Sequence, residues 1–409
     1  MGRVALRLAG VLAGIAVAAA VVLGIIAARR LDHRYHAPTP AITRATSADE
    51  VARGARLYRT ACATCHTQPG AAHSCGAAIP NFPTTFGTIV SSNLTRDPAR
   101  GIGARSDGEI ARLLRHGVMP DGRYSRTMPR ARLLGDQDIA ALLGFLRSAD
   151  PLFAPCAEET PAMHLSLLGR IALALFGPRS PSGDGDFDPA PVPVPPRAPS
   201  AAYGRYLATA IYGCVGCHTD GLDDVEAKLA SPNLLAGGLE LPDPRGDRVL
   251  STNLTPDPTG IRQWTLAQFD SALTTGLAPD GGAIRSPMPI LRFTDAVETE
   301  AIYRYLQSVP PVNRAPPVRR APPALSPSAP PEEVFLALGC APCHGQGAPF
   351  RNVLRGLADR PADAVAEAIR HPERAHPATQ MPTFAAVLDP SRAAALAHWL
   401  QETPGQVPR

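Results

Sequence analysis

The pattern Cys-x-x-Cys-His occurs three times in this chain and constrains it more than any other feature. The three copies use six of the eight cysteines. With 8 Cys and 11 His in 409 residues, chance alone would produce about 0.004 copies of such a pattern. The copies are therefore three sites of one kind. They consist of Cys62, Cys65 and His66, of Cys214, Cys217 and His218, and of Cys340, Cys343 and His344.

Other short segments repeat around these motifs. The sequence Asn-Leu-Thr-x-Asp-Pro starts at Asn93 and again at Asn253, and Pro-Asp-Gly follows at Pro120 and Pro279. Each unit then reaches a Met-Pro pair and ends with a helical pattern that closes on an aromatic residue and a leucine. This regularity indicates that the chain is a threefold repeat of one structural unit. The Met-Pro pairs are Met128-Pro129, Met288-Pro289 and Met381-Pro382.

Proline-rich segments separate the three units. Residues 178–200 hold eight prolines and residues 310–331 hold nine, and such segments form extended spacers without a core of their own. The predicted organisation is a membrane anchor or signal over 1–34, a first domain over 45–150, a connector over 151–200 that is proline-rich at its end, a second domain over 201–310, a proline-rich linker over 311–331 and a third domain over 332–405.

The motifs themselves indicate haem attachment. Two cysteines three positions apart can each form a thioether to one porphyrin, and the histidine that follows can bind its iron. Zinc needs four ligands per site, usually from two paired clusters, and no second Cys or His pair stands at that spacing within a unit. A redox dithiol would not need the histidine every time. The sequence therefore predicts three covalently bound haem c groups, held by the six motif cysteines, with His66, His218 and His344 as iron ligands.

The opposite iron ligand is predicted by elimination. In the second unit the one histidine is His218 and the one methionine is Met288, so Met288 is the expected partner. The third unit has one methionine, Met381, although it holds further histidines. In the first unit Met128 aligns with Met288 and shares its following proline, whereas Met119 aligns with an alanine. Histidine–methionine ligation leaves the iron without an open position, which suits electron transfer.

Apolar residues recur at helical spacing through the units. Ser47 with Glu50 three residues later predicts a helix start. No alternating run is long enough to predict a sheet, so the expected fold is all-α. Further helices are predicted over residues 109–116, 136–148, 266–273, 299–308, 362–370 and 392–401.

The N-terminal segment is apolar enough to cross a membrane. Residues 8–28 carry no charge, and a helix of this length spans about 30 Å, the thickness of a bilayer core. An uncleaved anchor is expected, with a cleaved secretory signal as the alternative. Haem is attached to such motifs outside the bacterial cytoplasm, so the body should lie on the periplasmic side of the inner membrane. A second apolar stretch, residues 165–176, is too short to span and is expected to pack between domains.

Composition narrows the class of function further. The formal net charge is +4, from 40 basic and 36 acidic residues, which is too balanced for a nucleic-acid-binding surface. Aromatic residues make up only 5% of the chain, and a buried haem would supply the missing apolar bulk in each unit. Cys75 and Cys156 lie outside the motifs. They could pair in an oxidising compartment or remain two unrelated thiols.

With its three motifs, its Met-Pro pairs and its Asn-Leu-Thr loops, the chain resembles the tri-haem cytochrome c subunits of membrane-bound bacterial alcohol, gluconate, sorbitol and aldehyde dehydrogenases. The resemblance covers about residue 45 to the end. It implies three tandem class I cytochrome c domains, here behind an N-terminal transmembrane helix. It also implies that electrons pass from a periplasmic dehydrogenase catalytic subunit toward ubiquinone or a terminal oxidase.

Two other functions stay open on the sequence alone. A free-standing, membrane-anchored electron carrier would have the same haem motifs. A haem enzyme, such as a peroxidase or a sulfur-compound oxidase, would need at least one haem with an open or displaceable ligand. The non-catalytic electron-transfer subunit is preferred because all three predicted sites have both axial ligands and because the chain resembles subunits of dehydrogenase complexes.

Overall fold

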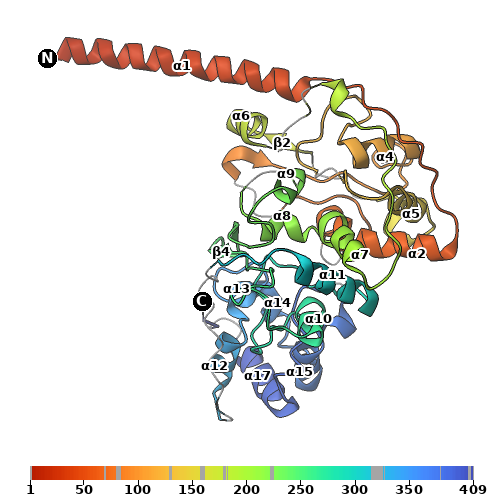
Figure 1. The fold of residues 1–409 in the computed structure, drawn as a ribbon. Helices are drawn as coiled ribbons and strands as arrows, with labels where there is room; N and C mark the ends of the chain where they lie inside the picture. The colour runs from red at the N-terminus through yellow and green to blue at the C-terminus, as the bar shows by residue number, and fades with distance from the viewer. Residues whose placement is uncertain are drawn as a thin grey trace. The chain divides into compact units, whose positions relative to one another are not determined.

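The protein consists of two compact units, Met1–Val194 and Pro195–Arg409, and its helices are shown in Figure 1. Most of the predicted linker over 311–331, and Pro129 of the first Met-Pro pair, lie outside the described residues. The three-domain division stays a prediction, with both later repeats in the second unit. The computed structural model describes residues 2–68, 71–79, 84–128, 131–156, 162–177, 181, 183–221, 225–314, 326, 328–377, 379–403 and 407–408.

The N-terminal unit is mostly helical, as the sequence predicts. Ser47 caps the first helix of the repeat by accepting a hydrogen bond from the Glu50 amide, which confirms the predicted start. The helices are α1 (Gly2–Asp32), α2 (Ala48–Leu57), α3 (Ala63–His66), α4 (Asp107–His116), α5 (Asp136–Leu146) and α6 (Leu167–Phe176), with a π-helical turn η1 (Tyr58–Cys62) and 3-10 turns η2 (Thr84–Phe86), η3 (Pro151–Phe153) and η4 (Asp184–Asp186).

The core of this unit forms where α2 crosses α5. A Cβ placed on Gly54 would lie 2.0 Å from the carbonyl oxygen of Ala141, so only glycine lets the two backbones meet. Beside this crossing Tyr58, Phe145 and Phe153 form an aromatic cluster with ring centroids 5.1 to 5.6 Å apart. All three rings are almost fully buried, so they act as packing residues.

The C-terminal unit repeats this arrangement. In its first half α7 crosses α11, and a Cβ on Gly204 would lie 1.8 Å from the carbonyl oxygen of Ala301. In its second half α12, α15 and α17 enclose a core that includes Phe335 and Leu396. The helices are α7 (Ala201–Tyr206), α8 (Cys214–His218), α9 (Val225–Leu229), α10 (Leu266–Thr275), α11 (Ala296–Ser308), α12 (Pro331–Ala337), α13 (Ala341–His344), α14 (Arg351–Arg355), α15 (Ala362–Arg370), α16 (Pro372–Ala375) and α17 (Pro390–Glu402), with a π-helical turn η5 (Leu207–Ile211).

Two short antiparallel strand pairs depart from the expected absence of sheet. In the N-terminal unit β1 (Gly87–Thr88) pairs with β2 (His164–Leu165). In the C-terminal unit β3 (Glu240–Pro242) pairs with β4 (Arg248–Leu250). Strands of two or three residues are too short to show an alternating pattern, which explains why the sequence did not predict them.

Helix α6 corresponds to the second apolar stretch, and it packs against α1. Ala27 and Ala174 are buried, with 1% and 3% exposure, and Arg30 Nη1 donates to the Ala174 carbonyl at 3.3 Å. Leu167 and Phe176 of α6 stay exposed. Within the described residues, α1 is the one helix long and apolar enough to cross a membrane, with mean hydropathy 2.8.

Candidate haem-binding sites

Helix α8 holds its whole Cys-x-x-Cys-His motif, whereas α3 and α13 each begin one residue after the first cysteine, whose backbone is also in the α-helical region. Residues three apart on a helix share one face, so the two thiols of each motif lie on the same side, with the histidine in the following position. The chain enters α8 through Gly213 and approaches α13 through Gly339, at φ of +64° and +74°, a conformation that favours glycine. All six motif cysteines are free thiols rather than disulfides.

The motif histidines are held in one orientation at all three sites. The Nδ1 atom of His66 lies 2.8 Å from the carbonyl oxygen of Ser92, and that of His218 lies 2.8 Å from the carbonyl oxygen of Thr252. At the third site the histidine makes the same kind of contact with a carbonyl six residues later in the chain.

At that third site, His344 Nδ1 lies 3.2 Å from the carbonyl oxygen of Phe350. A carbonyl oxygen can only accept, so each histidine donates from Nδ1 and keeps the lone pair of Nε2 for a metal. Burial also lowers the pKa of His66, His218 and His344, which favours the neutral imidazole that binds iron. These donors fit an axial ligand.

The thiols do not fit a redox dithiol. Burial raises the pKa of Cys62, Cys214 and Cys340 to about 12. Reactive dithiols need the opposite shift, because the thiolate is the attacking species. Within the described residues, no cluster of three or more His, Cys, Asp or Glu side chains could hold a metal ion by itself. The arrangement therefore fits covalent attachment of a porphyrin better than the two alternatives.

The Asn-Leu-Thr loops explain how two of these histidines are oriented. Asn93 Oδ1 accepts hydrogen bonds from the backbone N and the hydroxyl of Thr95, at 2.8 and 2.7 Å. Asn253 makes the same pair of contacts with Thr255, at 2.9 and 2.8 Å. The carbonyl that faces the motif histidine belongs to the residue just before each asparagine. Both asparagines are buried, so each Asn-Leu-Thr segment is a structural loop beside its motif histidine.

The Pro-Asp-Gly segments form equivalent turns in the first two repeats. Gly122 N donates to the carbonyl of Met119 at 2.9 Å, and Gly281 N donates to the carbonyl of Ala278 at 2.8 Å. Met119 therefore occupies the same turn position as Ala278. This agreement supports the sequence alignment, in which Met119 matches an alanine and Met128 is therefore the preferred iron ligand.

The three proposed methionine ligands lie in loops and are half-buried. Met128 N donates to Ser125 Oγ at 3.2 Å, and Met288 N donates to the carbonyl of Arg285 at 3.1 Å. Met381 lies in a loop of the last repeat and packs against its core. Their role as iron ligands, and the roles of the motif residues, stay predictions.

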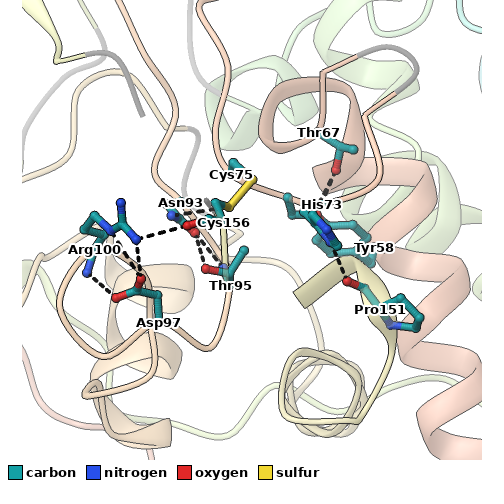
Figure 2. Close-up of a disulfide and its surroundings, with 11 residues drawn as sticks. Tyr58, Thr67, His73, Cys75, Asn93, Thr95, Asp97, Arg100, Pro151 and Cys156 are labelled. Atoms are coloured by element: carbon teal, nitrogen blue, oxygen red, sulfur yellow. Dashed lines mark hydrogen bonds and ion pairs between the residues drawn. A yellow bond between two sulfur atoms is a disulfide. The ribbon is translucent and has the colours of Figure 1, made fainter. Parts of the chain in front are cut away.

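Cys75 and Cys156 form a disulfide in the N-terminal unit, which decides between the two alternatives that the sequence left open. Figure 2 shows the bond beside the loop that holds Asn93. The Nδ2 atom of Asn93 lies 3.8 Å from Cys156 Sγ. Arg100 Nη2 donates to the Cys156 carbonyl at 3.0 Å. The bond joins the segment after the first motif to the segment after η3. It lies next to the loop whose Ser92 carbonyl contacts His66.

Lys228 is a supporting residue that sequence analysis did not single out. It is the one lysine of the chain, and it is 4% exposed. Its Nζ donates to the carbonyl oxygens of Gly216 and Thr219 at 2.5 and 2.9 Å. Last-turn carbonyls of a helix lack partners inside the helix, so Lys228 stabilises the end of α8 that carries His218. Nothing in the sequence indicates that the Lys228 amine is buried, because its two acceptors lie nine and twelve residues earlier in the chain.

Comparison with known proteins decides the family. A diheme c-type cytochrome of Cereibacter sphaeroides is 30% identical over 284 residues, which cover 64% of this chain and 87% of the relative. The chain belongs to the c-type cytochromes. Residues 49–146 of this cytochrome also match the family described as cytochrome c oxidase, cbb3-type, subunit III. The predicted haem chemistry of the chain thus has independent support at the level of family.

Two further relatives of the cytochrome belong to dehydrogenases. The cytochrome c subunit of a quinone alcohol dehydrogenase from Gluconacetobacter polyoxogenes is 27% identical over 64% of this chain and 56% of the relative. One subunit of the nicotinate dehydrogenase from Pseudomonas putida is 29% identical over 73% of this chain and 24% of the relative. The cytochrome therefore spans 56% of the length of the alcohol dehydrogenase subunit and 24% of the length of the nicotinate dehydrogenase subunit.

Proposed function

We propose that this cytochrome carries three covalently bound haem c groups and is the non-catalytic electron-transfer subunit of a dehydrogenase complex. It would receive electrons from a periplasmic catalytic subunit and pass them toward ubiquinone or a terminal oxidase. The names of the dehydrogenase relatives support a partner of this class. The nature of the acceptor rests on the family resemblance of the sequence.

One observation carries this proposal: the three motif histidines all donate from Nδ1 to a backbone carbonyl. This leaves Nε2 of His66, His218 and His344 available at each site. A bound haem would supply reversible one-electron oxidation and reduction there. The motif cysteines and histidine of each repeat would hold the haem, and the loop methionine of the same repeat would supply the second iron ligand.

The methionine ligands suit a carrier rather than an enzyme. Met128, Met288 and Met381 would close the second axial position at each site. A closed site takes and gives electrons without binding a small substrate at the metal. A haem enzyme would instead need one of these side chains to be absent or displaced.

Helix α1 is proposed as an anchor in the bacterial inner membrane, with the two units on the periplasmic side. Its length and mean hydropathy of 2.8 suit a membrane span. The Cys75–Cys156 disulfide supports an oxidising compartment for the rest of the chain. Protease treatment of spheroplasts tests the orientation, because a periplasmic body would be cleaved from outside.

Purification of the native protein from membranes tests the function. Three haems per chain, counted by pyridine haemochrome absorbance and by peptide mass spectrometry, and a large co-purifying dehydrogenase subunit are expected. Fewer than three thioether-linked haems would refute the site assignment. Three haems without any large partner would instead favour the free-standing anchored carrier. Strong carbon monoxide binding by the reduced native protein would favour a haem enzyme.

A further inference from the structure

A buried arginine joins two loops that the proposed function makes important. Arg292 lies four residues after Met288, and its side chain is only 8% exposed. Its Nε donates to the carbonyl of Thr379 at 3.0 Å, and its Nη1 donates to Thr383 Oγ1 at 2.8 Å. Its Nη2 donates to the carbonyl oxygen of Met381. One guanidinium therefore binds three residues of the loop that carries the third proposed methionine ligand.

Other contacts around the arginine hold the Met381 loop against the Met288 loop and against the end of α10. Ile290 N donates to Gln380 Oε1 at 2.7 Å, and Thr383 N donates to the carbonyl of Thr275 at 2.8 Å. Leu277, which follows α10, belongs to the apolar core of the last repeat. The two methionine loops thus meet in one continuous contact inside the C-terminal unit, and Arg292 is its polar centre.

The chemistry of arginine suits this position. Its planar guanidinium presents five N–H donors in a fixed fork, and here it also reaches the carbonyl of Thr274 at 3.2 Å. Glu373 Oε2 lies 4.0 Å from Nη1 and accepts from the Thr383 hydroxyl at 2.8 Å. The buried positive charge therefore has a carboxylate nearby. A lysine has a single ammonium group and could not bind all these acceptors at once.

The first repeat provides an internal comparison. Arg132 stands four residues after Met128, as Arg292 does after Met288, but Arg132 is exposed. Its carbonyl accepts a hydrogen bond from Arg115 Nη1 at 2.7 Å. The same sequence position is therefore used differently, and of these two arginines it is Arg292 that is buried against another methionine loop.

We propose that Arg292 is a positioning residue that fixes the Met288 loop and the Met381 loop to each other, so that the distal ligands of the second and third sites are set together. The inference rests on the proposed function, because it concerns the methionines as iron ligands. Met381 is bound directly through its own carbonyl, whereas Met288 is reached along four residues of backbone. The third site should therefore depend on Arg292 more strongly than the second.

The test uses the full-length, haem-loaded protein in detergent, with Arg292→Met and Arg132→Met as a matched pair. Three readouts are compared: the methionine-to-iron charge-transfer band of the oxidised protein, carbon monoxide binding by the reduced protein, and a potentiometric titration. Arg292→Met should lose roughly a third of the band, because one of three predicted methionine bonds opens. It should gain one carbon monoxide site and shift at least one midpoint potential. Arg132→Met should leave all three readouts unchanged.

Two further variants keep the result interpretable. Arg292→Lys retains the charge but not the fork, and should resemble Arg292→Met. Thr383→Val removes one acceptor of the guanidinium and should give a smaller change of the same kind if Arg292→Met fails to accumulate. An unchanged band and unchanged potentials in Arg292→Met, with only a lower melting temperature, would overturn the proposal. A charge-transfer band missing from the unmodified protein would overturn the ligand assignment itself, and with it this inference.

Discussion

Removal of the Cys75–Cys156 disulfide should destabilise the N-terminal unit by a calculable amount. The two cysteines are 81 residues apart, and the loop-closure entropy of a chain that long corresponds to about 4.5 kcal/mol at 25 °C. Measured losses on removing native disulfides are typically about 2–5 kcal/mol. The double variant Cys75→Ser/Cys156→Ser should therefore lower the free energy of unfolding of this unit by about 3 to 4.5 kcal/mol.

The chain provides its own control for this measurement. Both tryptophans, Trp264 and Trp399, lie in the C-terminal unit, so their fluorescence follows that unit alone. Hydrogen exchange of peptides from α2 and α5, read by mass spectrometry in increasing denaturant, follows the N-terminal unit. We expect the exchange midpoint of α2 and α5 to fall while the fluorescence midpoint stays in place. A loss below about 1 kcal/mol in the N-terminal unit, or an equal shift of both midpoints, would refute the reasoning.

Three further changes have expected outcomes. Gly204→Ala should lower the free energy of unfolding of the C-terminal unit by about 1–3 kcal/mol in denaturant titrations, because its methyl group would meet the Ala301 carbonyl; Gly10→Ala, with nothing within 4 Å, should be neutral. Backbone hydrogen bonds lower the pKa of Asp97 below its ordinary value of 3.8, so the stabilising effect of this carboxylate is present above about pH 4 and is lost as the pH falls through the lower folded pKa. Asp97→Asn should therefore be less stable than the native chain at pH 7 and nearly equal to it at low pH. Thermal melts at the two pH values check this. Met288→Ala should give the reduced protein one new carbon monoxide site, seen in a difference spectrum, and an unchanged spectrum would contradict its assignment as a ligand.

Much of the helical fold could be predicted from the sequence, because long amphipathic segments have a local signal. The helices around Ser47, over 136–148 and over 299–308 appear where the apolar spacing placed them. The short strands β1 and β3 were missed, since two or three residues show no periodicity. The π-helical turns before the first two motifs were also missed, because they depend on how each helix meets its partner.

The candidate sites show the same division between local and long-range information. The motif residues, and the equivalence of Met119 with an alanine, could be found from spacing alone. The acceptors for the histidines could not, because Ser92 and Thr252 lie far from His66 and His218 in sequence. Arg292 carried no signal either: its counterpart Arg132 has the same sequence context and a different environment.

The glycine crossings bear on how such a chain is assembled after export. In each of the first two repeats the opening helix is covered by the closing helix, α2 by α5 at Gly54 and α7 by α11 at Gly204. In sequence, each thiol pair follows the opening helix of its repeat by a few residues and precedes the closing helix. During secretion they would reach the far side of the membrane well ahead of the helix that shuts the repeat. On the proposed export and haem attachment, an enzyme that joins the porphyrin would meet the thiol pairs of the first two repeats in an open bundle, and closure of the bundle would follow attachment.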